Sequence, residues 1–254
     1  MSLLHALILG LVEGITEFLP VSSTAHLILA GHALRLADSE FLKSFEIIIQ
    51  LGAILSVVVL YWNKFWHWDV LKKLVVAVIP TGIIGLTVYK ALKAYLLGNV
   101  VVVLCALVVG GIALIIFERF PKRDVEEIDF AEISYGKALL IGLFQSIAII
   151  PGVSRSAATI VGGSLIGISK RTIVEFSFML AVPTMLAASG LELVKGRSAL
   201  AGHYTPLAVG FVVSFVTAII AIKSFLGYIK KHDFAAFGWY RIVLALVYFL
   251  VFLR

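Results

Sequence analysis

The stretch "EGITEFLPVSSTAH", residues 13–26, decides the fold because it places polar groups inside an otherwise apolar region. It contains two carboxylates, four hydroxyl side chains and a histidine, while residues 2–34 around it contain no Lys or Arg. Irregular backbone at membrane depth is tolerated only where protein or a water-filled cavity surrounds it. These polar residues are therefore expected to line a cavity inside the protein.

The composition is that of a helical membrane protein. The chain has 254 residues, of which 61% are hydrophobic and 14% charged, with a mean hydropathy of +1.07. Soluble domains carry about a quarter charged residues, so membrane lipids are the expected surroundings. The net charge of +6 lies in scattered loop residues without interleaved aromatics, which argues against nucleic-acid binding. The single Cys105 excludes an intramolecular disulfide.

Six stretches are long and apolar enough to cross a bilayer core of about 30 Å. They cover residues 44–62, 73–92, 98–117, 173–193, 205–227 and 237–253. No Lys or Arg precedes the first apolar run, and Glu13 follows it early. We therefore expect the first residues to belong to the mature fold, not to a cleaved signal peptide.

Two further apolar regions, 2–34 and 138–169, do not fit a simple span. Each would be about 48 Å long as one straight helix, which exceeds the thickness of the membrane core. Each is interrupted near its middle, at Leu19-Pro20 and at Pro151-Gly152. Because proline removes a helical donor and clashes with the preceding turn, both regions are predicted to be re-entrant hairpins of two half-helices.

The two hairpins resemble each other, which indicates a duplication. Residues 21–24 align with residues 153–156, Glu13 aligns with Gln145, and Gly31 aligns with Gly163. Three spans follow each hairpin, so the second copy must be inverted, as in proteins with broken helices that meet near the midplane.

The predicted fold is an all-α polytopic membrane protein with two inverted repeats, each a re-entrant hairpin plus three transmembrane helices. It forms one membrane domain over residues 1–254. The first repeat covers about 1–117, a charged cytoplasmic linker covers 118–134, and the second repeat covers about 135–254.

Positive residues predict the orientation. The side expected to face the cytoplasm carries twelve: Lys64, Lys72, Lys73, Arg119, Lys122, Arg123, Lys137, Lys170, Arg171, Lys223, Lys230 and Lys231. The other side carries seven: Arg35, Lys43, Lys90, Lys93, Lys195, Arg197 and Arg254. By the positive-inside rule, both termini and the entrance of the first hairpin are expected to be extracytoplasmic.

Glu13 and Glu17 are candidate metal ligands. Their i, i+4 spacing puts both carboxylates on one helix face, about 5–6 Å apart. Two adjacent carboxylates in a low-dielectric site need a cation or a proton. Mg²⁺ suits a site with few carboxylates that phosphate oxygens complete. The alternative is a wet, structural pair at the mouth of the hairpin.

Three hydroxyl residues, Ser22, Ser23 and Thr24, follow Pro20 where the chain turns. One of them is a candidate nucleophile, but such residues also serve structural roles, namely close packing of helices and capping of a helix. His26 follows Ser23 by three residues and Ser22 by four, so it could act on a hydroxyl as general base or acid. A buried histidine can also simply be a satisfied core residue.

Arg155 is the deep cation of residues 138–169, and a buried guanidinium needs an anionic partner. Its rigid fork of donors matches phosphate, although a glutamate would also serve as the partner. Gly152, Ser154, Ser156 and Thr159 surround it next to an expected half-helix N-terminus, which would form an anion cradle. Together with the acid pair and the hydroxyl residues, this assembly suits phosphoryl transfer.

These segments also resemble a known family. "EGITEFLPVSSTAH" and "PGVSRSAAT" (151–159) resemble the two signature motifs of the bacterial undecaprenyl pyrophosphate phosphatases, the bacitracin-resistance family. "FEIIIQLGAI" (45–54) resembles a further stretch of that family, and the likeness extends over essentially the whole chain. One departure is Ala25, where the family usually has glycine.

The resemblance implies a bacterial cell-membrane enzyme that hydrolyses undecaprenyl diphosphate to the monophosphate. This reaction recycles the lipid carrier for cell-wall polymers and confers bacitracin resistance. It also implies roles for matching residues: an acidic pair at Glu13 and Glu17, a nucleophile at Ser23 flanked by Ser22 and Thr24, a histidine at His26, and a phosphate-binding Arg155 beside Ser154. We expect His26 or Glu17 to handle the protons, and Ser22 and Thr24 to bind phosphate together with the cradle around Arg155.

Alternatives remain at the level of the sequence. A proton- or cation-coupled transporter or flippase of an anionic substrate would use the same inverted repeats and broken helices. The hydroxyl residues with His26 argue for an enzyme, because a pure binding site does not require them. The lipid phosphatases with a histidine nucleophile are disfavoured, since residues 157–169 contain no His or Asp. The attacking hydroxyl and the formation of a homodimer stay open.

Overall fold

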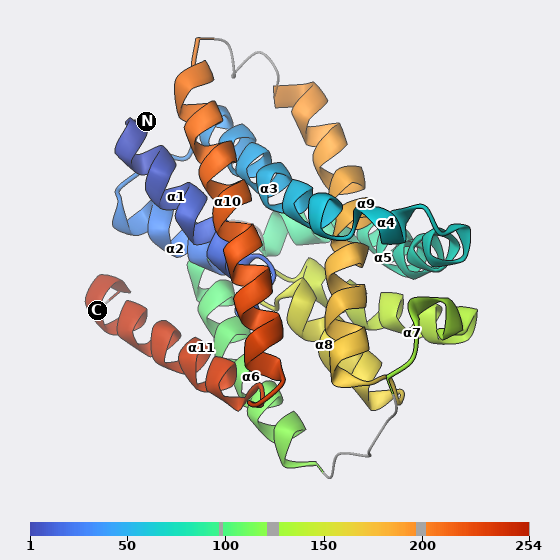
Figure 1. Ribbon diagram of the computed structural model, residues 1–254. Coiled ribbons are helices and arrows are strands. Elements are labelled where there is room, and N and C mark those ends of the chain that lie inside the picture. The colour runs from blue at the N-terminus through green and yellow to red at the C-terminus, as the bar shows by residue number, and fades with distance from the viewer. Residues whose placement is uncertain (97–98, 121–126, 197–201, 254) are drawn as a thin grey trace.

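The computed structural model describes residues 1–96, 99–120, 127–196 and 202–253. In these residues all regular structure is helical (Figure 1). The elements are α1 (Leu3–Thr16), α2 (Ser23–Ala33), α3 (Glu40–Leu60), α4 (Trp62–Phe65), α5 (Trp68–Tyr95), α6 (Val100–Arg119), η1 (Phe130–Glu132), α7 (Tyr135–Ser146), η2 (Ile147–Ile149), α8 (Arg155–Leu165), α9 (Lys170–Gly196), α10 (Tyr204–Ile229), α11 (Ala235–Tyr248) and η4 (Phe249–Leu253). Part of the predicted linker, residues 121–126, and the predicted loop cations Lys122, Arg123, Arg197 and Arg254 lie outside the described residues.

Six helices in the described part of the chain are long and apolar enough to cross a membrane. Their spanning segments are Glu40–Leu60, Trp68–Val88, Val100–Arg119, Lys170–Gly190, Tyr204–Ile229 and Ala235–Leu253. Each overlaps one of the spans predicted from the sequence, so the prediction of an all-helical, multi-pass membrane protein is confirmed.

The two regions that were too long for a span each contain two shorter helices. α1 packs against α2, and α7 packs against α8. We call the turn at residues 17–22 tip 1 and the turn at residues 150–154 tip 2. The last residue of each tip, Ser22 or Ser154, is left-handed, with φ of 72° and 74° respectively. Each serine Oγ accepts a hydrogen bond from the backbone N–H three residues later, so both tips end in a capped helix N-terminus.

Small residues let the helices around the tips approach closely. α1 lies along α10, and a Cβ added at Gly10 would lie 2.7 Å from the carbonyl oxygen of Gly210. α6 and α11 cross side by side at the lower left of Figure 1, where a Cβ on Gly111 would lie 2.6 Å from the Gly238 carbonyl oxygen. Close helix crossings of this kind are typical of membrane bundles.

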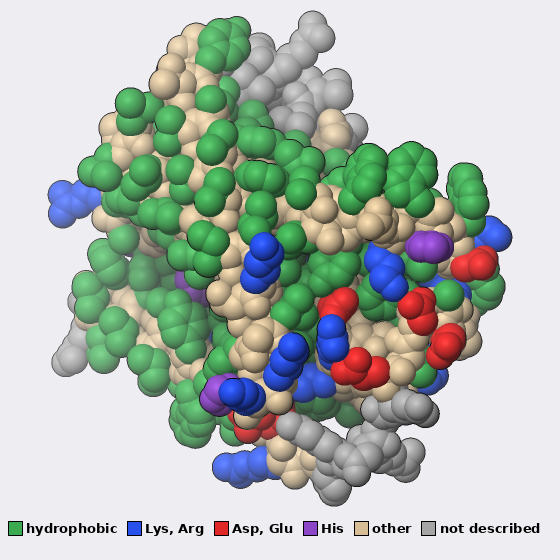
Figure 2. All heavy atoms as spheres, viewed as in Figure 1, with side chains coloured by type: hydrophobic (Ala, Val, Ile, Leu, Met, Phe, Trp, Pro, Cys, Tyr) green, Lys and Arg blue, Asp and Glu red, His purple; other side chains and the backbone are tan. Residues whose placement is uncertain are grey.

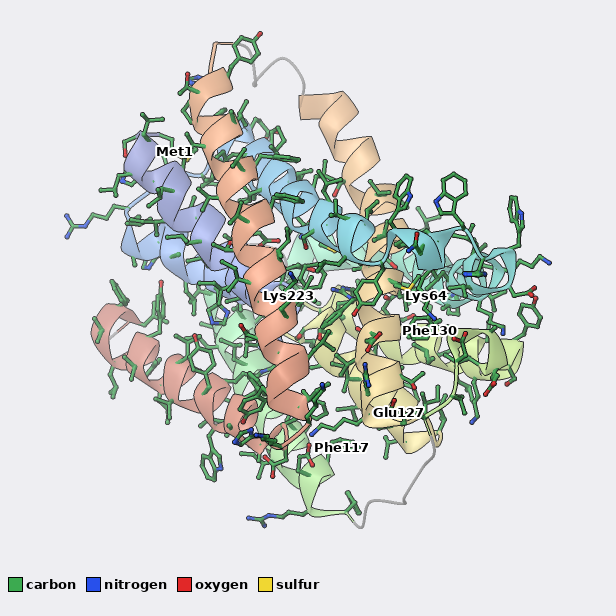
Figure 3. The ribbon with its side chains drawn as sticks, in the orientation of Figure 1. Met1, Lys64, Phe117, Glu127, Phe130 and Lys223 are labelled. Atoms are coloured by element: carbon green, nitrogen blue, oxygen red, sulfur yellow. The ribbon has the colours of Figure 1, made fainter. Side chains whose placement is uncertain are left out.

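On the face that Figure 2 shows, most charged side chains gather toward one end. Figure 2 shows hydrophobic side chains over most of the visible face and charged ones gathered at its lower right. There Lys64 bonds Asp129 at 3.0 Å and lies over the ring of Phe130 (Figure 3). The Ala131 backbone N–H and then Lys64 hold the pKa of Asp129 below its usual value.

Three tryptophans, Trp62, Trp66 and Trp68, flank this charged end and are 53%, 69% and 75% exposed. Tryptophan is enriched where a membrane meets water.

Candidate functional site

A pocket of about 250 Å³ lies between the two tips and the middles of the long helices. Its lining comes from both short-helix pairs and from α3, α5 and α9: Glu17, Ser22, Ser23, Thr24, Gln50, Thr81, Gln145, Ala148, Ile149, Ile150, Pro151, Gly152, Ser154, Arg155, Thr184, Met185 and Ala188. The pocket thus brings together segments that lie more than a hundred residues apart in the sequence.

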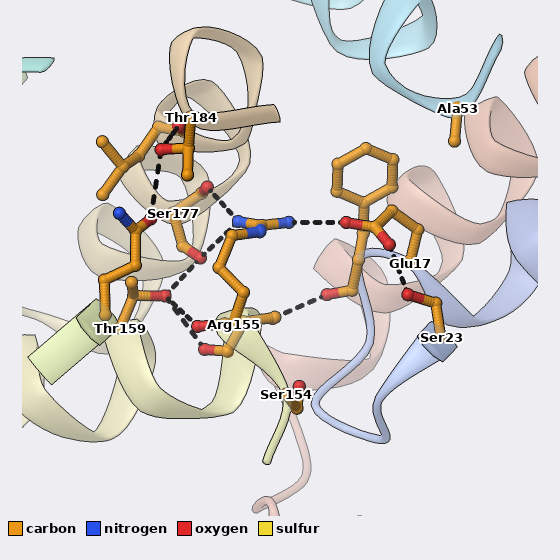
Figure 4. Close-up of polar contacts among 12 residues, drawn as sticks. Glu17, Ser23, Ala53, Ser154, Arg155, Thr159, Ser177 and Thr184 are labelled. Atoms are coloured by element: carbon orange, nitrogen blue, oxygen red, sulfur yellow. Dashed lines mark hydrogen bonds and ion pairs between the residues drawn. The ribbon is translucent and has the colours of Figure 1, made fainter. Parts of the chain in front are cut away.

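Ser23, Glu17 and Arg155 form one connected group in the pocket (Figure 4). The Ser23 hydroxyl donates a short hydrogen bond to Oε2 of Glu17. The other carboxylate oxygen, Oε1, lies 3.2 Å from Nη2 of Arg155. The ion pair is shielded from solvent, with side-chain exposures of 4% for Glu17 and 12% for Arg155. A hydroxyl is therefore held by a carboxylate whose charge is balanced by a guanidinium.

Arg155 is fixed from its far side by α9. Its Nη1 donates to the backbone oxygen of Ser177 at 2.7 Å, and the Ser177 hydroxyl lies 2.6 Å from that of Thr159. The Nε atom is buried and has no hydrogen-bond partner. The guanidinium thus has donors, the Nε–H among them, that the protein does not use. Ser177 was not predicted from the sequence, because a single serine in an apolar span carries no signal of its partner.

The helices α2 and α8 both begin at the pocket. Ser23 is the first residue of α2 and Arg155 is the first residue of α8. The free backbone N–H groups of a helix N-terminus attract anions. Two such ends beside one pocket therefore favour a ligand that carries several negative charges.

The residues predicted to bind phosphate around Arg155 divide into two groups. Ser22, Thr24, Gly152 and Ser154 line the pocket. Ser156 and Thr159 do not; they support its walls.

Ser156 ties the two halves of the site together, since its hydroxyl donates to the Phe18 carbonyl of tip 1 at 2.8 Å. Thr159 donates to the Arg155 carbonyl at 2.9 Å.

His26 lies elsewhere than its spacing from the hydroxyl residues suggested. Its Nδ1 lies 2.7 Å from the Ser22 carbonyl oxygen, and its Nε2 lies 2.7 Å from the hydroxyl of Tyr240 on α11. The ring stacks on Tyr240 at 5.6 Å. Both ring nitrogens are thus engaged, and neither contacts the Ser23 hydroxyl. The reason is geometric: His26 lies one helical turn after Ser22, so its Nδ1 and its backbone N–H both lie at the Ser22 carbonyl oxygen.

Glu13 is fully buried, and neither of its carboxylate oxygens has a hydrogen-bond partner. Glu17 and Glu46 are its acidic neighbours. A buried carboxylate without donors requires a cation or a proton, so Glu13 beside Glu17 fits either a metal ion or a proton shared by the two carboxyl groups. No group of three or more His, Cys, Asp or Glu among the described residues forms a ready metal site. Phosphate oxygens and water would have to complete the coordination.

The opposite wall of the pocket is polar but uncharged. Gln145, buried on α7, donates to the Thr81 hydroxyl at 2.9 Å and accepts from Thr184 at 3.4 Å. This wall was not predicted, apart from the alignment of Gln145 with Glu13. The charged chemistry of the pocket is therefore concentrated at the tips.

Comparison with known proteins agrees with this geometry. The family described as bacitracin resistance protein BacA matches residues 6–247. An undecaprenyl-diphosphatase of Aquifex aeolicus is 49% identical, with 98% of both chains covered. The undecaprenyl-diphosphatase of Bdellovibrio bacteriovorus is 50% identical, with 97% of this chain and 95% of the relative covered.

Proposed function

Because the chain belongs to the bacitracin resistance protein BacA family, we propose that it is an undecaprenyl-diphosphatase of the cell membrane. It would release phosphate from the lipid diphosphate and leave the lipid monophosphate, which returns to cell-wall synthesis. The observation that carries the proposal is the hydrogen bond from Ser23 to Glu17, beside Arg155 in a pocket between two helix N-termini.

The reaction begins with attack by the Ser23 oxygen on the terminal phosphorus. Glu17 accepts the hydroxyl proton, since its Oε2 already accepts the hydrogen bond. The bond from phosphorus to the bridging oxygen breaks, and the lipid monophosphate leaves with that oxygen. Water then attacks the phosphoserine, which releases phosphate and restores Ser23.

Arg155 binds and orients the diphosphate. Its guanidinium lines the pocket with donors that Glu17 and Ser177 do not use, and Ser177 keeps the guanidinium plane in place. The backbone N–H groups at the starts of α2 and α8, with Ser22, Thr24, Gly152 and Ser154, complete the cradle. His26 bonds the Ser22 carbonyl of tip 1 and does not contact Ser23. Proton transfer is therefore assigned to Glu17, which does.

Glu13, with Glu17, would hold a divalent cation such as Mg²⁺. The unpartnered carboxylate of Glu13 supports this assignment. The cation would offset the charge of the diphosphate, which a single arginine balances only in part.

The two halves of the chain would be inverted repeats, each with a re-entrant pair of half-helices. The nearly equal φ of Ser22 and Ser154, and the same capping pattern at the starts of α2 and α8, support this proposal. The repeats would form one membrane domain, divided by the linker at 118–134. The pocket would open to the extracytoplasmic side, where the positive-inside rule also puts both termini.

The lipid tail would occupy apolar space between the helices. A groove of about 710 Å³ behind tip 1, between α1, α10 and α11, has the required apolar lining. It includes Leu19, Val21 and Phe225.

The decisive experiment measures phosphate release from undecaprenyl diphosphate by purified protein in detergent, with Mg²⁺ and with a chelator. A transporter or flippase would release none. Ser23→Ala should abolish release, because only Ser23 bonds the proposed base. Thr24→Ala removes one group of the cradle and should raise KM while release continues. Full activity of Ser23→Ala would refute the assigned nucleophile.

A further inference from the structure

Arg241, on α11, is completely buried although it does not line the pocket. Among the described residues it is the largest fully buried side chain. A guanidinium at membrane depth is costly and needs a structural or functional reason.

The guanidinium of Arg241 holds both tips at once. Nη1 donates to the Pro20 carbonyl of tip 1 at 3.4 Å and to the Val153 carbonyl of tip 2 at 3.2 Å. Nη2 donates to the Gly152 carbonyl of tip 2 at 2.8 Å and to the Ala106 carbonyl of α6 at 3.0 Å. One planar group therefore joins the two tips, α6 and its own helix.

Glycine makes room for this contact. A Cβ added at Gly110 of α6 would lie 2.2 Å from Nη2 of Arg241. At tip 2, a Cβ on Gly152 would lie 2.8 Å from the Val103 carbonyl oxygen, and its φ of 95° also favours glycine. The guanidinium thus occupies a socket that a single methyl group would close.

Three of the four carbonyls that Arg241 holds, those of Pro20, Gly152 and Val153, lie one or two residues before Ser22 or Ser154. Ser22 and Ser154 have left-handed φ, which costs free energy in residues other than glycine and persists only where surrounding contacts impose it. Ser23 and Arg155 follow them immediately. A displacement of either tip would therefore move the nucleophile or the phosphate-binding cation.

We propose that Arg241 is a positioning residue that fixes tip 1 against tip 2, and thereby aligns Ser23 with the phosphate bound at Arg155. The inference rests on the proposed phosphatase function for its kinetic consequence, but not for its structural one. Arginine is required because its rigid fork reaches carbonyls of three segments, whereas a lysine ammonium is a compact point charge on a flexible stem.

The structural consequence is tested by hydrogen–deuterium exchange of the purified protein. Arg241→Met should speed exchange at residues 17–24 and 150–156 together. Lys73→Met is the matched control, because Lys73 is also buried and donates to the carbonyls of Phe130 and Ala131, away from the tips. It should leave tip exchange unchanged. Faster exchange at one tip only, at neither, or evenly along the chain would overturn the proposal.

The kinetic consequence is tested on the same proteins. Arg241→Met and Arg241→Lys should lower kcat by about 100-fold, as small misplacements of reacting groups do, and change KM far less. Gly110→Ala should lower kcat in the same way while Arg241 itself is unchanged. Gly227→Ala adds a methyl group in open space and should leave kcat unchanged. The positioning role would be overturned if Arg241→Lys kept full kcat. It would also be overturned if Gly110→Ala kept full kcat although its two tips exchanged faster. Absence of activity in the unaltered protein would instead refute the phosphatase, and the exchange results would still decide the tip contact.

Discussion

Arg155 shows how one residue serves both the resting site and the ligand. It balances Glu17 at 3.2 Å and is anchored on Ser177 at 2.7 Å, while its Nε remains without a partner. An ammonium could replace one of these two contacts but could not make both and also offer a further donor in the same plane.

We therefore expect Arg155→Lys to lose nearly as much activity as Arg155→Ala. The measurement is turnover at saturating lipid diphosphate. Arg171→Lys, an exposed arginine paired with Glu175 at 3.0 Å, is the control and should be unaffected. If Arg155→Lys retained most of its turnover, the guanidinium would not be needed to bind the phosphate through several donors.

The unpartnered carboxylate of Glu13 predicts a second change. Glu13→Gln and Glu17→Gln should each raise the Mg²⁺ concentration needed for half-maximal activity, because each removes an anionic ligand. Glu13→Gln is the cleaner variant, since Glu17 also bonds Ser23. Glu40→Gln, at the exposed start of α3, serves as control. An Mg²⁺ titration identical in Glu13→Gln and the unaltered protein would assign Glu13 to proton handling or structure.

For single residues, the sequence predicts which side chains belong to the site better than it predicts which groups they contact. Ser22, Ser23, Thr24, Ser154 and Arg155 could be picked out because polar groups in apolar surroundings are conspicuous. The orientation of the His26 ring could not, because it depends on a tyrosine from a helix more than two hundred residues away.

Arg241 did leave a signal. It is a cation inside the predicted span 237–253, and an ionisable residue at that depth marks a functional position by default.

Among the elements, the contact between α1 and α10 determines where tip 1 lies. A Cβ on Gly14 would lie 1.9 Å from the Thr217 hydroxyl and 2.5 Å from the Ser214 carbonyl oxygen. The backbone oxygen cannot move aside as a flexible side chain can.

Gly14→Ala should therefore destabilise the protein by about 1–3 kcal/mol, the usual cost of overpacking a close contact. The measurement is thermal unfolding in detergent. Gly227→Ala on α10 has no atom within 4 Å of the added Cβ and should leave the midpoint unchanged. Equal midpoints for both variants would contradict the close crossing.

Proline alone did not determine the element boundaries. Pro80 and Pro183 lie inside α5 and α9 without ending them, since membrane helices tolerate proline where neighbours satisfy the freed groups. At the tips, polar and small residues follow the proline, and the left-handed serines end the turn. Hydropathy thus predicts the six spans, whereas the length of each tip depends on local capping.

For the whole molecule, the charge bias predicts which side of the membrane the pocket faces. Ser39→Cys and Ser134→Cys form a matched pair in a Cys105→Ala background, because both serines are exposed N-caps, of α3 and α7. In intact cells, Ser39→Cys should react with a membrane-impermeant thiol reagent. Ser134→Cys should react only after the membrane is opened. The reverse pattern would turn the pocket toward the cytoplasm.

The global arrangement is the part that the sequence predicts least directly. The weak repeat predicts that the two tips meet, but not that α11 and α6 close over them. That closure depends on the glycine contact between Gly111 and Gly238, which has no periodic pattern to reveal it.

The exposed tryptophans at the charged end give the unaltered protein an optical probe. Trp62, Trp66 and Trp68 lie close together there, with the rings of Trp62 and Trp66 5.5 Å apart, and Trp239 on α11 is the only other tryptophan in the sequence. Intrinsic fluorescence is therefore dominated by that end. Lipids brominated next to their headgroups should quench it more strongly than lipids brominated at the chain ends, so emission reports how deeply this end is immersed without any label.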